Sequence, residues 1–132
     1  MDLPALQASM PFTNLLGIEL VAASPEEVRG RLAWDETHCT SGGVLHGGAL
    51  MGLADSLGGV CAFLNLPEGA AGTTTIESKT NFLRAVTEGH VDGVCRPLHV
   101  GRTVIVVDTD LFDTRGKRVA RTTQTQAVLK GG

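Results

Sequence analysis

The longest apolar stretch of the chain, residues 42–64, repeats its large side chains at helical spacing. At about 100° per residue, one face of a helix in this stretch carries Leu50, Leu53, Leu57, Cys61 and Leu64. The opposite face is mostly glycine and bears a single charge, Asp55. The pattern predicts a central helix over about residues 46–64, with the leucine face buried in a core.

Other segments alternate between apolar and polar residues, which is the period of a half-buried strand. A short amphipathic helix is predicted over residues 3–12, with Pro4 at an early helical position. Short turns between consecutive strands favour antiparallel pairing, so we expect an α+β fold in which one helix packs against a curved antiparallel sheet. The predicted strands are residues 15–22, 28–34, 73–84, 89–99, 103–112 and 119–129.

Length and composition exclude several classes of protein. A chain of 132 residues is long enough for one domain with a real core, so we expect a single domain over residues 1–132. A net charge of −3, four Phe, one Trp and no Tyr argue against a nucleic-acid partner. No charge-free apolar run reaches the ~18 residues of a membrane span, so no membrane partner is expected.

The cysteines and the absence of nucleotide motifs bear on location and cofactors. The three cysteines are widely spaced and odd in number, which indicates reduced thiols in a cytoplasmic protein. The sequence has no CxxC pair and no close pair of histidines, so no metal site is expected. It also lacks a P-loop and a GxGxxG motif, and no cofactor is implied.

The glycine-rich helix face suggests a binding surface. Five glycines lie between residues 47 and 59, and each costs a helix interior ~1 kcal/mol relative to alanine. A face without side chains, including Gly48 and Gly59, lets a ligand or a second backbone approach closely. Asp55 on this face is either paired with a basic or hydroxyl side chain or is a functional acid, base or nucleophile. We interpret it as the functional group, and the sequence does not choose between general base and nucleophile.

The start of the predicted helix offers hydrogen-bond donors. The amides of Gly47 and Gly48 fall in the first turn, where N–H groups lack helical partners and favour an anion or a polarised carbonyl oxygen. His46, just before them, either caps the helix or acts in the chemistry. A donor for a developing oxyanion and a carboxylate in a groove are two parts of an acyl-transfer site.

Two neighbouring motifs connect these residues to a known family. They are Leu45-His46-Gly47-Gly48 and Leu53-Ala54-Asp55. Together they resemble the signature of the PaaI-like hotdog-fold thioesterases, relatives of the Arthrobacter-type 4-hydroxybenzoyl-CoA thioesterases. Later landmarks of that family are similar to Asn81-Phe82-Leu83-Arg84-Ala85 and Gly101-Arg102-Thr103. The resemblance runs from about Leu16 to Val128.

The resemblance implies an acyl-CoA thioesterase that releases a free acid and coenzyme A from an aryl-, arylacetyl- or medium-chain acyl-CoA. It implies a hotdog fold, in which the sheet wraps the helix, and a homodimer that often pairs again into a tetramer. Gly47 would donate its N–H to the thioester carbonyl. Thr40 stands where the family often has Asn or Gln. Thr74, with Thr73 as its rival, lies about where relatives carry a Ser or Thr that holds the attacking water.

Two further residues and two other functions enter as possibilities. Arg84 and Arg102, beside the family-like landmarks, offer charges for the phosphates of the substrate. A non-catalytic acyl-CoA-binding module would keep the groove but would not need Asp55. An enoyl-CoA hydratase on the same fold would need a paired Asp and His that the sequence does not show.

The spacing of the two central groups predicts a shared site. Gly47 and Asp55 are eight residues apart on one predicted helix, which is about 12 Å along its axis. Both groups must lie ~3 Å from one carbonyl, and one straight helix cannot easily achieve that. Two copies related by a two-fold axis can, so we expect each active site to use two subunits.

Overall fold

The computed structural model describes residues 2–131. Helices and strands follow one another in the order that the sequence predicts, except near the N-terminus. The elements are α1 (Leu3–Ala8), α2 (Pro11–Leu15), β1 (Glu19–Ala23), β2 (Val28–Ala33), two 3-10 turns (Glu36–His38 and Ser41–Gly43), α3 (Gly47–Leu64), β3 (Ala70–Phe82), β4 (His90–Val100), β5 (Val104–Phe112) and β6 (Arg118–Lys130).

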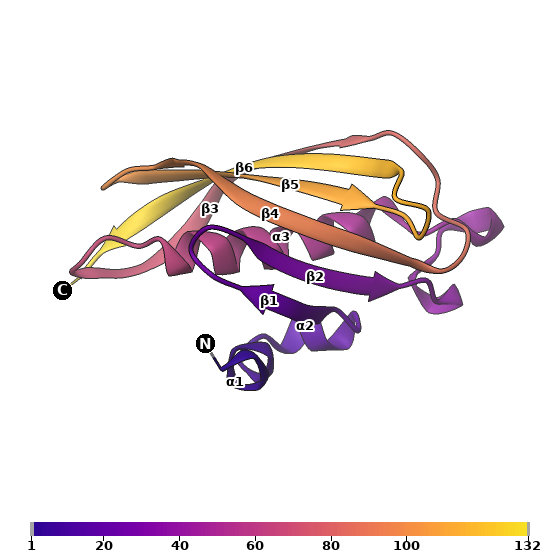
Figure 1. The fold of residues 1–132 in the computed structure, drawn as a ribbon, viewed down its shortest axis with the longest axis horizontal. Coiled ribbons are helices and arrows are strands. Elements are labelled where there is room, and N and C mark those ends of the chain that lie inside the picture. The colour runs from indigo at the N-terminus through magenta and orange to yellow at the C-terminus, as the bar shows by residue number, and fades with distance from the viewer. Residues whose placement is uncertain (1, 132) are drawn as a thin grey trace.

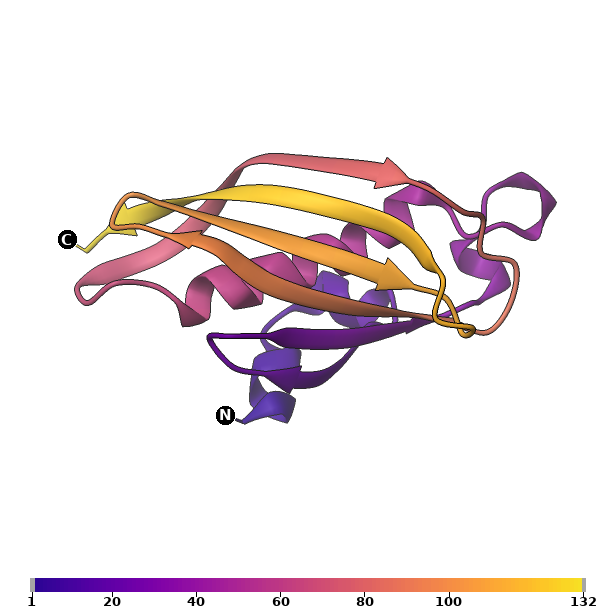
Figure 2. The same cartoon turned by 45° about the horizontal axis from the view of Figure 1, so that its top comes forward.

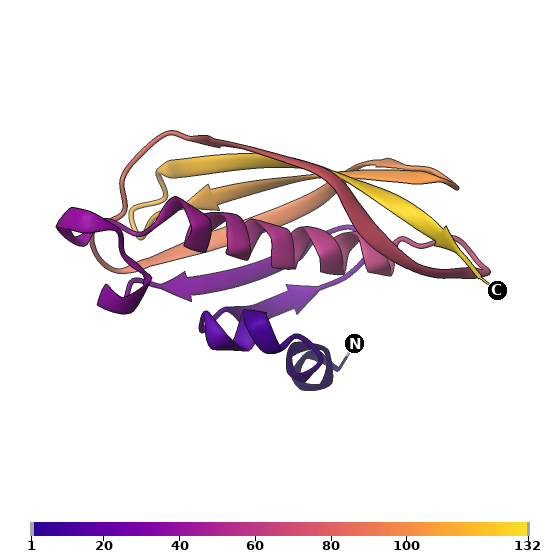
Figure 3. The ribbon, with the colours of Figure 1, turned by 180° about the vertical axis from the view of Figure 1, so that it is seen from behind.

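The six strands form one antiparallel sheet in the order β1-β2-β4-β5-β6-β3. The sheet curves around α3, which lies along its inner face (Figures 1 and 2). Seen from behind, α3 runs as one continuous helix, with α1 and α2 beside it below β1 (Figure 3). The α+β prediction, with a curved sheet around one long helix, is confirmed.

The leucine face of α3 forms the centre of the core. Leu53, Leu57 and Cys61 are fully buried against the sheet, while Leu64 is half-buried at the end of the helix. Leu57 lies so close to the strands that a Cβ on Gly30 or Gly93 would come within 2.7 or 2.5 Å of its methyl groups. Glycine on these two strands therefore allows the helix to approach the sheet closely.

The N-terminal prediction is wrong in one respect. Residues 3–12 do not form one helix, because α1 ends at Ala8 and a second helix begins at Pro11. Proline cannot donate the N–H that a continuous helix needs, but it is suited to the first position of a new one. Since α2 continues to Leu15, the strand predicted from residue 15 begins only at Glu19.

Helix α3 is long and apolar enough, by length and composition, to cross a membrane. Half of it is nevertheless buried inside the domain, where it packs against five of the six strands, β2 to β6. The helix is thus the core helix of the fold, which is the other kind of helix that passes such a test.

Candidate active site

The N-terminus of α3 presents one free backbone donor. His46 is the N-cap, and its Nδ1 accepts a hydrogen bond from the Gly48 N–H at 2.7 Å. Within residues 2–131 the Gly47 N–H has no such acceptor. The structure therefore separates Gly47, the predicted oxyanion donor, from Gly48, a predicted substrate-binding residue, because the Gly48 amide is engaged by the cap and the Gly47 amide remains available.

The loop before α3 is folded back on the start of the helix. Cys39 and Leu45 form an isolated bridge, and the Thr40 N–H donates to Val44 O at 2.8 Å. The indole of Trp34 donates to Gly43 O at 2.9 Å, which holds the tip of the loop. Thr40 thus lies in the part of the loop that pairs with the segment leading into α3, and its side chain is exposed.

Asp55 lies midway along α3, where the helix borders both the sheet strand β6 and an apolar groove. Its Oδ1 accepts a hydrogen bond from Gln124 Nε2 at 2.7 Å. Partial burial raises the pKa of Asp55 above the ordinary value of 3.8, while the bond from Gln124 acts in the opposite direction. Among the described residues no Lys, Arg or His pairs with it, so the carboxylate is not one half of a structural ion pair.

The prediction for Thr74 is not supported. In the register of β3 and β6, Thr74 pairs with Ala127, whereas Thr75 pairs with Gln126. Adjacent strand residues point to opposite faces, so Thr74 faces away from α3. The hydroxyls on the helix side belong to Thr73, which donates to Gln126 Oε1 at 3.0 Å, and to Thr75, which accepts from Gln126 Nε2 at 2.7 Å.

An apolar groove of about 450 Å³ opens beside Asp55. One wall is α3 and the other is formed by α1 and α2, which the sequence analysis had not assigned to the site. Thr13 of α2 is tied to Ser56 of α3 by a hydrogen bond of 2.8 Å between their hydroxyls. The lining residues are Leu6, Ser9, Met10, Phe12, Thr13, Gly52, Asp55, Ser56, Gly59, Val60 and Phe63.

The glycines on the exposed face of α3 do not share one role. A Cβ on Gly52 would come within 2.7 Å of a methyl group of Leu16, so this glycine lets the chain after α2 pack against the helix. A Cβ on Gly59 would meet nothing within 4 Å. Gly59 therefore leaves open space in the groove, in agreement with the predicted bare face, and Gly52 does so only in part.

The predicted phosphate-binding arginines lie at opposite ends of the molecule. Arg84 follows β3 near the start of α3, and Arg102 lines a hollow with Ala70, the first residue of β3. The 13 residues of β3 separate them by about 40 Å along the strand. Within residues 2–131 neither guanidinium forms an ion pair, but one chain cannot use both for the same phosphate.

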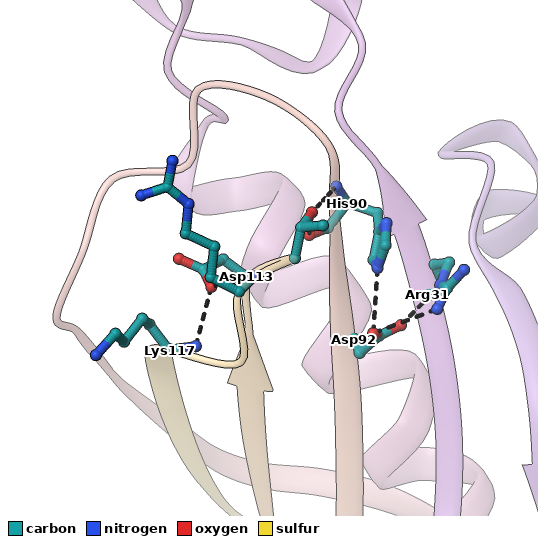
Figure 4. Close-up of polar contacts among 7 residues, drawn as sticks. Arg31, His90, Asp92, Asp113 and Lys117 are labelled. Carbon is teal, nitrogen blue, oxygen red and sulfur yellow. Dashed lines mark hydrogen bonds and ion pairs between the residues drawn. The ribbon is translucent and has the colours of Figure 1, made fainter.

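The hollow beside Arg84 has a volume of about 480 Å³ and also includes Arg115. Arg115 lies in a turn held by Asp113, whose Oδ1 accepts from the Arg115 N–H and, as Figure 4 shows, from the Lys117 N–H, both at 2.9 Å. To the right of this turn, Asp92 lies between His90 and Arg31, at 3.3 and 2.7 Å (Figure 4). Glu88 and Asp113 line the hollow together with the two arginines, so its charges of opposite sign balance.

Residues 2–131 contain no group of three or more His, Cys, Asp or Glu that could hold a metal ion. The groove instead combines an apolar wall, one carboxylate with a raised pKa and, elsewhere on the same helix, one unengaged amide. These are the groups that hydrolysis of an activated acyl compound requires.

Comparison with known proteins decides which family has this arrangement. The family model described as "Thioesterase superfamily" matches residues 42–120, which include His46, Gly47 and Asp55. The chain belongs to the thioesterase superfamily. It is accordingly a thioester hydrolase, and the resemblance read from its two motifs is confirmed.

Named relatives of this superfamily member span most of its length. It is 33% identical over 131 residues to the proofreading thioesterase EntH of Cronobacter turicensis, which covers 98% of this chain and 95% of the relative. A 39% match over 87 residues to the 1,4-dihydroxy-2-naphthoyl-CoA hydrolase of Escherichia coli covers 66% of this chain and 63%, less than two thirds, of that relative. The crystal structure of a mutant thioesterase from Pseudomonas aeruginosa superposes with a TM-score of 0.92 at 33% identity, covering 98% and 95% of the two chains.

Proposed function

We propose that this thioesterase hydrolyses acyl-CoA substrates whose apolar acyl group, an aryl, arylacetyl or medium-chain group, occupies the groove between α2 and α3. The observation that carries the proposal is the position of Asp55, the one titratable side chain among the residues that line this apolar groove. A carboxylate at the wall of an apolar pocket is placed to act on a carbonyl bound there. Named relatives that act on thioesters, one of them on a CoA ester, support this choice.

Asp55 has two chemically complete routes. As a general base it takes a proton from a water molecule, whose oxygen attacks the thioester carbonyl carbon. As a nucleophile its own oxygen attacks, and water then hydrolyses the resulting anhydride. In both routes the carbon–sulfur bond breaks, coenzyme A leaves as the thiolate and is protonated, and the acid is released.

The proposed oxyanion donor is the Gly47 N–H of a second copy of the chain. Gly47 and Asp55 of one α3 are about 12 Å apart along the axis, and the helix between them is uninterrupted. Strand β3 lies at one edge of the sheet, with 13 residues available for pairing, which supports assembly of two copies. We therefore propose a homodimer, paired again into a dimer of dimers, that has composite active sites.

Other predicted residues fit around this centre as contacts of the coenzyme A arm. His46, whose Nδ1 caps α3, and Thr40, in the loop paired with the segment before α3, would contact the thioester end of the substrate. Arg84 lies at the same end, and Arg102 would have to come from a different copy. The free thiols of Cys39, Cys61 and Cys95 are in keeping with the predicted cytoplasmic location.

The direct test is the release of free coenzyme A thiol from a panel of benzoyl-, phenylacetyl-, hexanoyl-, octanoyl- and acetyl-CoA. We expect turnover of the apolar substrates at a kcat/KM well above that of acetyl-CoA. Equal rates for all acyl groups would show that the groove does not bind them. The absence of turnover with every member would contradict the proposed substrate class.

The groove yields a prediction at Gly59. Replacing it by leucine adds a Cβ that meets nothing within 4 Å, extends the side chain into the groove and raises helix propensity by up to ~1 kcal/mol. We expect Gly59→Leu to be at least as stable as the wild type, yet to have a strongly raised KM for the larger acyl-CoA substrates. Gly59→Ala, which adds one methyl group, should raise KM much less. An unchanged KM in Gly59→Leu would place the acyl group elsewhere.

A further inference from the structure

The side of Asp55 that faces the sheet is in contact with a glutamine that the sequence analysis did not single out. Gln124 lies on β6 and is completely buried, and its Nε2 donates to Asp55 Oδ1 at 2.7 Å. The same Nε2 lies 3.4 Å from Thr75 Oγ1 on β3. The carboxylate is thus tied to two strands of the sheet, while its other oxygen, Oδ2, forms no such bond within residues 2–131.

Gln124 is an expensive residue for this position. Its Oε1 is buried and has no hydrogen-bond partner in the described part of the chain. Burying such a group lowers the stability of the fold, which an apolar side chain of the same size would not do. A glutamine whose buried Oε1 has no partner is explained if its Nε2, which donates to Asp55, has a function.

The helix also accommodates this glutamine specifically. A Cβ on Gly58 would overlap Gln124 Oε1, so only glycine allows the amide to lie against the helix backbone at this point. Gly58 is buried in the middle of α3, where glycine lowers helix stability relative to alanine. Gly58 and Gln124, which are 66 positions apart in sequence, are each destabilising where they stand, and both are needed for this one contact.

We propose that Gln124 is a positioning residue that holds Asp55 by Oδ1, keeps it ionised and leaves Oδ2 directed to the substrate. The proposal rests on the proposed function of Asp55 as base or nucleophile. An amide N–H donates to the charged form of a carboxylate and stabilises it, which opposes the desolvation that an apolar groove and a bound acyl group impose. With one oxygen fixed, the side chain also has fewer orientations to lose on the way to the transition state.

Within residues 2–131, no charged group on the neighbouring strands or in the groove takes over this role. Glu77 and Lys79 of β3 pair with Thr125 and Thr123, on the opposite face of the sheet from Gln124. Arg121 of β6 forms ion pairs with Asp108 and Asp110 on that outer face. The groove residues of α1, α2 and α3 around Asp55 carry no second titratable side chain.

The test compares two buried glutamines of the same strand. Gln124→Met removes the donor to Asp55 at nearly constant size, and Gln126→Met removes an equally buried amide that contacts Thr73 and Thr75 but not Asp55. We expect Gln124→Met to lower kcat roughly 10- to 100-fold with little change in KM, and to move the acid limb of the kcat/KM profile up by about one pH unit. We expect Gln126→Met to leave the acid limb where it is.

Gly58→Ala and a direct titration of Asp55 test the same contact in two further ways. Gly58→Ala displaces the Gln124 amide and should reproduce the kinetic profile of Gln124→Met. In an Asp55→Asn background, Gln124→Met should cause no further loss, because the residue on which it acts is gone. Carboxyl NMR should show a higher Asp55 pKa in Gln124→Met than in wild type, independently of any turnover.

The outcomes distinguish a failure of the positioning role of Gln124 from a failure of the proposed substrate class. An unchanged Asp55 pKa and an unchanged acid limb in folded Gln124→Met would overturn the positioning role, as would an equal effect of Gln126→Met. A raised Asp55 pKa in an enzyme that hydrolyses no acyl-CoA would support the positioning of the carboxylate and refute the proposed substrate class.

Discussion

Asp55→Asn is expected to lower kcat by about 100-fold or more, because the amide can neither accept a proton nor attack a carbonyl. The variant should fold normally, since Asn retains an oxygen that can accept the bond from Gln124. Thiol release under saturating acyl-CoA measures the effect. Near-normal turnover would assign Asp55 a structural role and leave the groove without its reactive group.

The pH dependence of the wild type follows from the same residue. Burial raises the pKa of Asp55, so activity should fall on the acid side at a pH above the ordinary value of 3.8.

The effect of pH on the free energy of unfolding, through Asp55, has the opposite sign from that of an ion-paired carboxylate. The folded state retains the Asp55 proton at pH values where the unfolded chain has lost it, so stability falls as pH rises from 3.8 through the raised folded pKa.

Asp55→Asn should therefore melt at a higher temperature than wild type at pH 7 and at a similar temperature at pH 3. Thermal unfolding at both pH values, followed by circular dichroism, provides the measurement. A variant that is less stable than wild type at pH 7 would mean that the carboxylate stabilises the fold. An active site that costs stability is a common exchange in enzymes.

Mixing two inactive variants should restore about a quarter of the wild-type activity. The first variant, Asp55→Asn, lacks the reactive carboxylate, and the second, Gly47→Pro, lacks the free amide. Random pairing makes half of the dimers mixed, and each mixed dimer has one intact site if Gly47 and Asp55 come from different copies. If both groups acted within one chain, no mixed dimer would contain an intact site.

The helix start tolerates proline at position 47 by its backbone geometry. Gly47 is the first residue of α3, and His46 has φ −62° and ψ 136°, the conformation favoured before proline. Any added Cβ at Gly47 would come within 3.1 Å of the Phe82 ring. Gly47→Ala adds that Cβ and keeps the N–H, so it is the matched control and should keep most of its activity.

The complementation is read from subunits co-refolded one to one. Sedimentation should show that both variants assemble, and mass spectrometry of differently tagged chains should show that they mix. Mixed dimers without any recovered turnover would reject the composite site. Recovery in the mixture, with each parent inactive, would establish the site and its minimal assembly together.

The parts of the fold that sequence predicted well are those with a local signal. The leucine period of residues 50–64 predicted α3 to within one residue of its start, and the hydrophobic alternation of β2 matches its alternating burial. His46 lies directly before the helix, where the choice between a cap and a chemical role was left open; the structure shows the cap. The break at Pro11 had a local signal too, and it marks where the predicted helix should have ended.

The parts that were missed depend on contacts between distant segments. The sheet face to which Thr74 points depends on the register between β3 and β6, which lie about 50 residues apart in sequence. That register shifts at two irregular positions. Gln124 meets Asp55 across 69 residues of sequence, and neither residue signals the other. The groove wall from α1 and α2 is likewise a tertiary feature, although the amphipathic spacing of Leu6 and Met10 was a local hint that this segment has a buried side.

The separation of the groove into two walls has a consequence for how this enzyme can diversify. Asp55, the proposed reactive group, and its partner Gln124 belong to the helix and the sheet, whereas the opposite wall is supplied by α1 and α2, which precede the sheet in sequence. That wall is fastened by a few contacts, among them Gln7 to the backbone of Ile18 and Leu20, and Thr13 to Ser56. If the acyl group occupies this groove as proposed, substitutions at Leu6, Met10 or Phe12 should change which acyl groups fit while the core and Asp55 stay as they are.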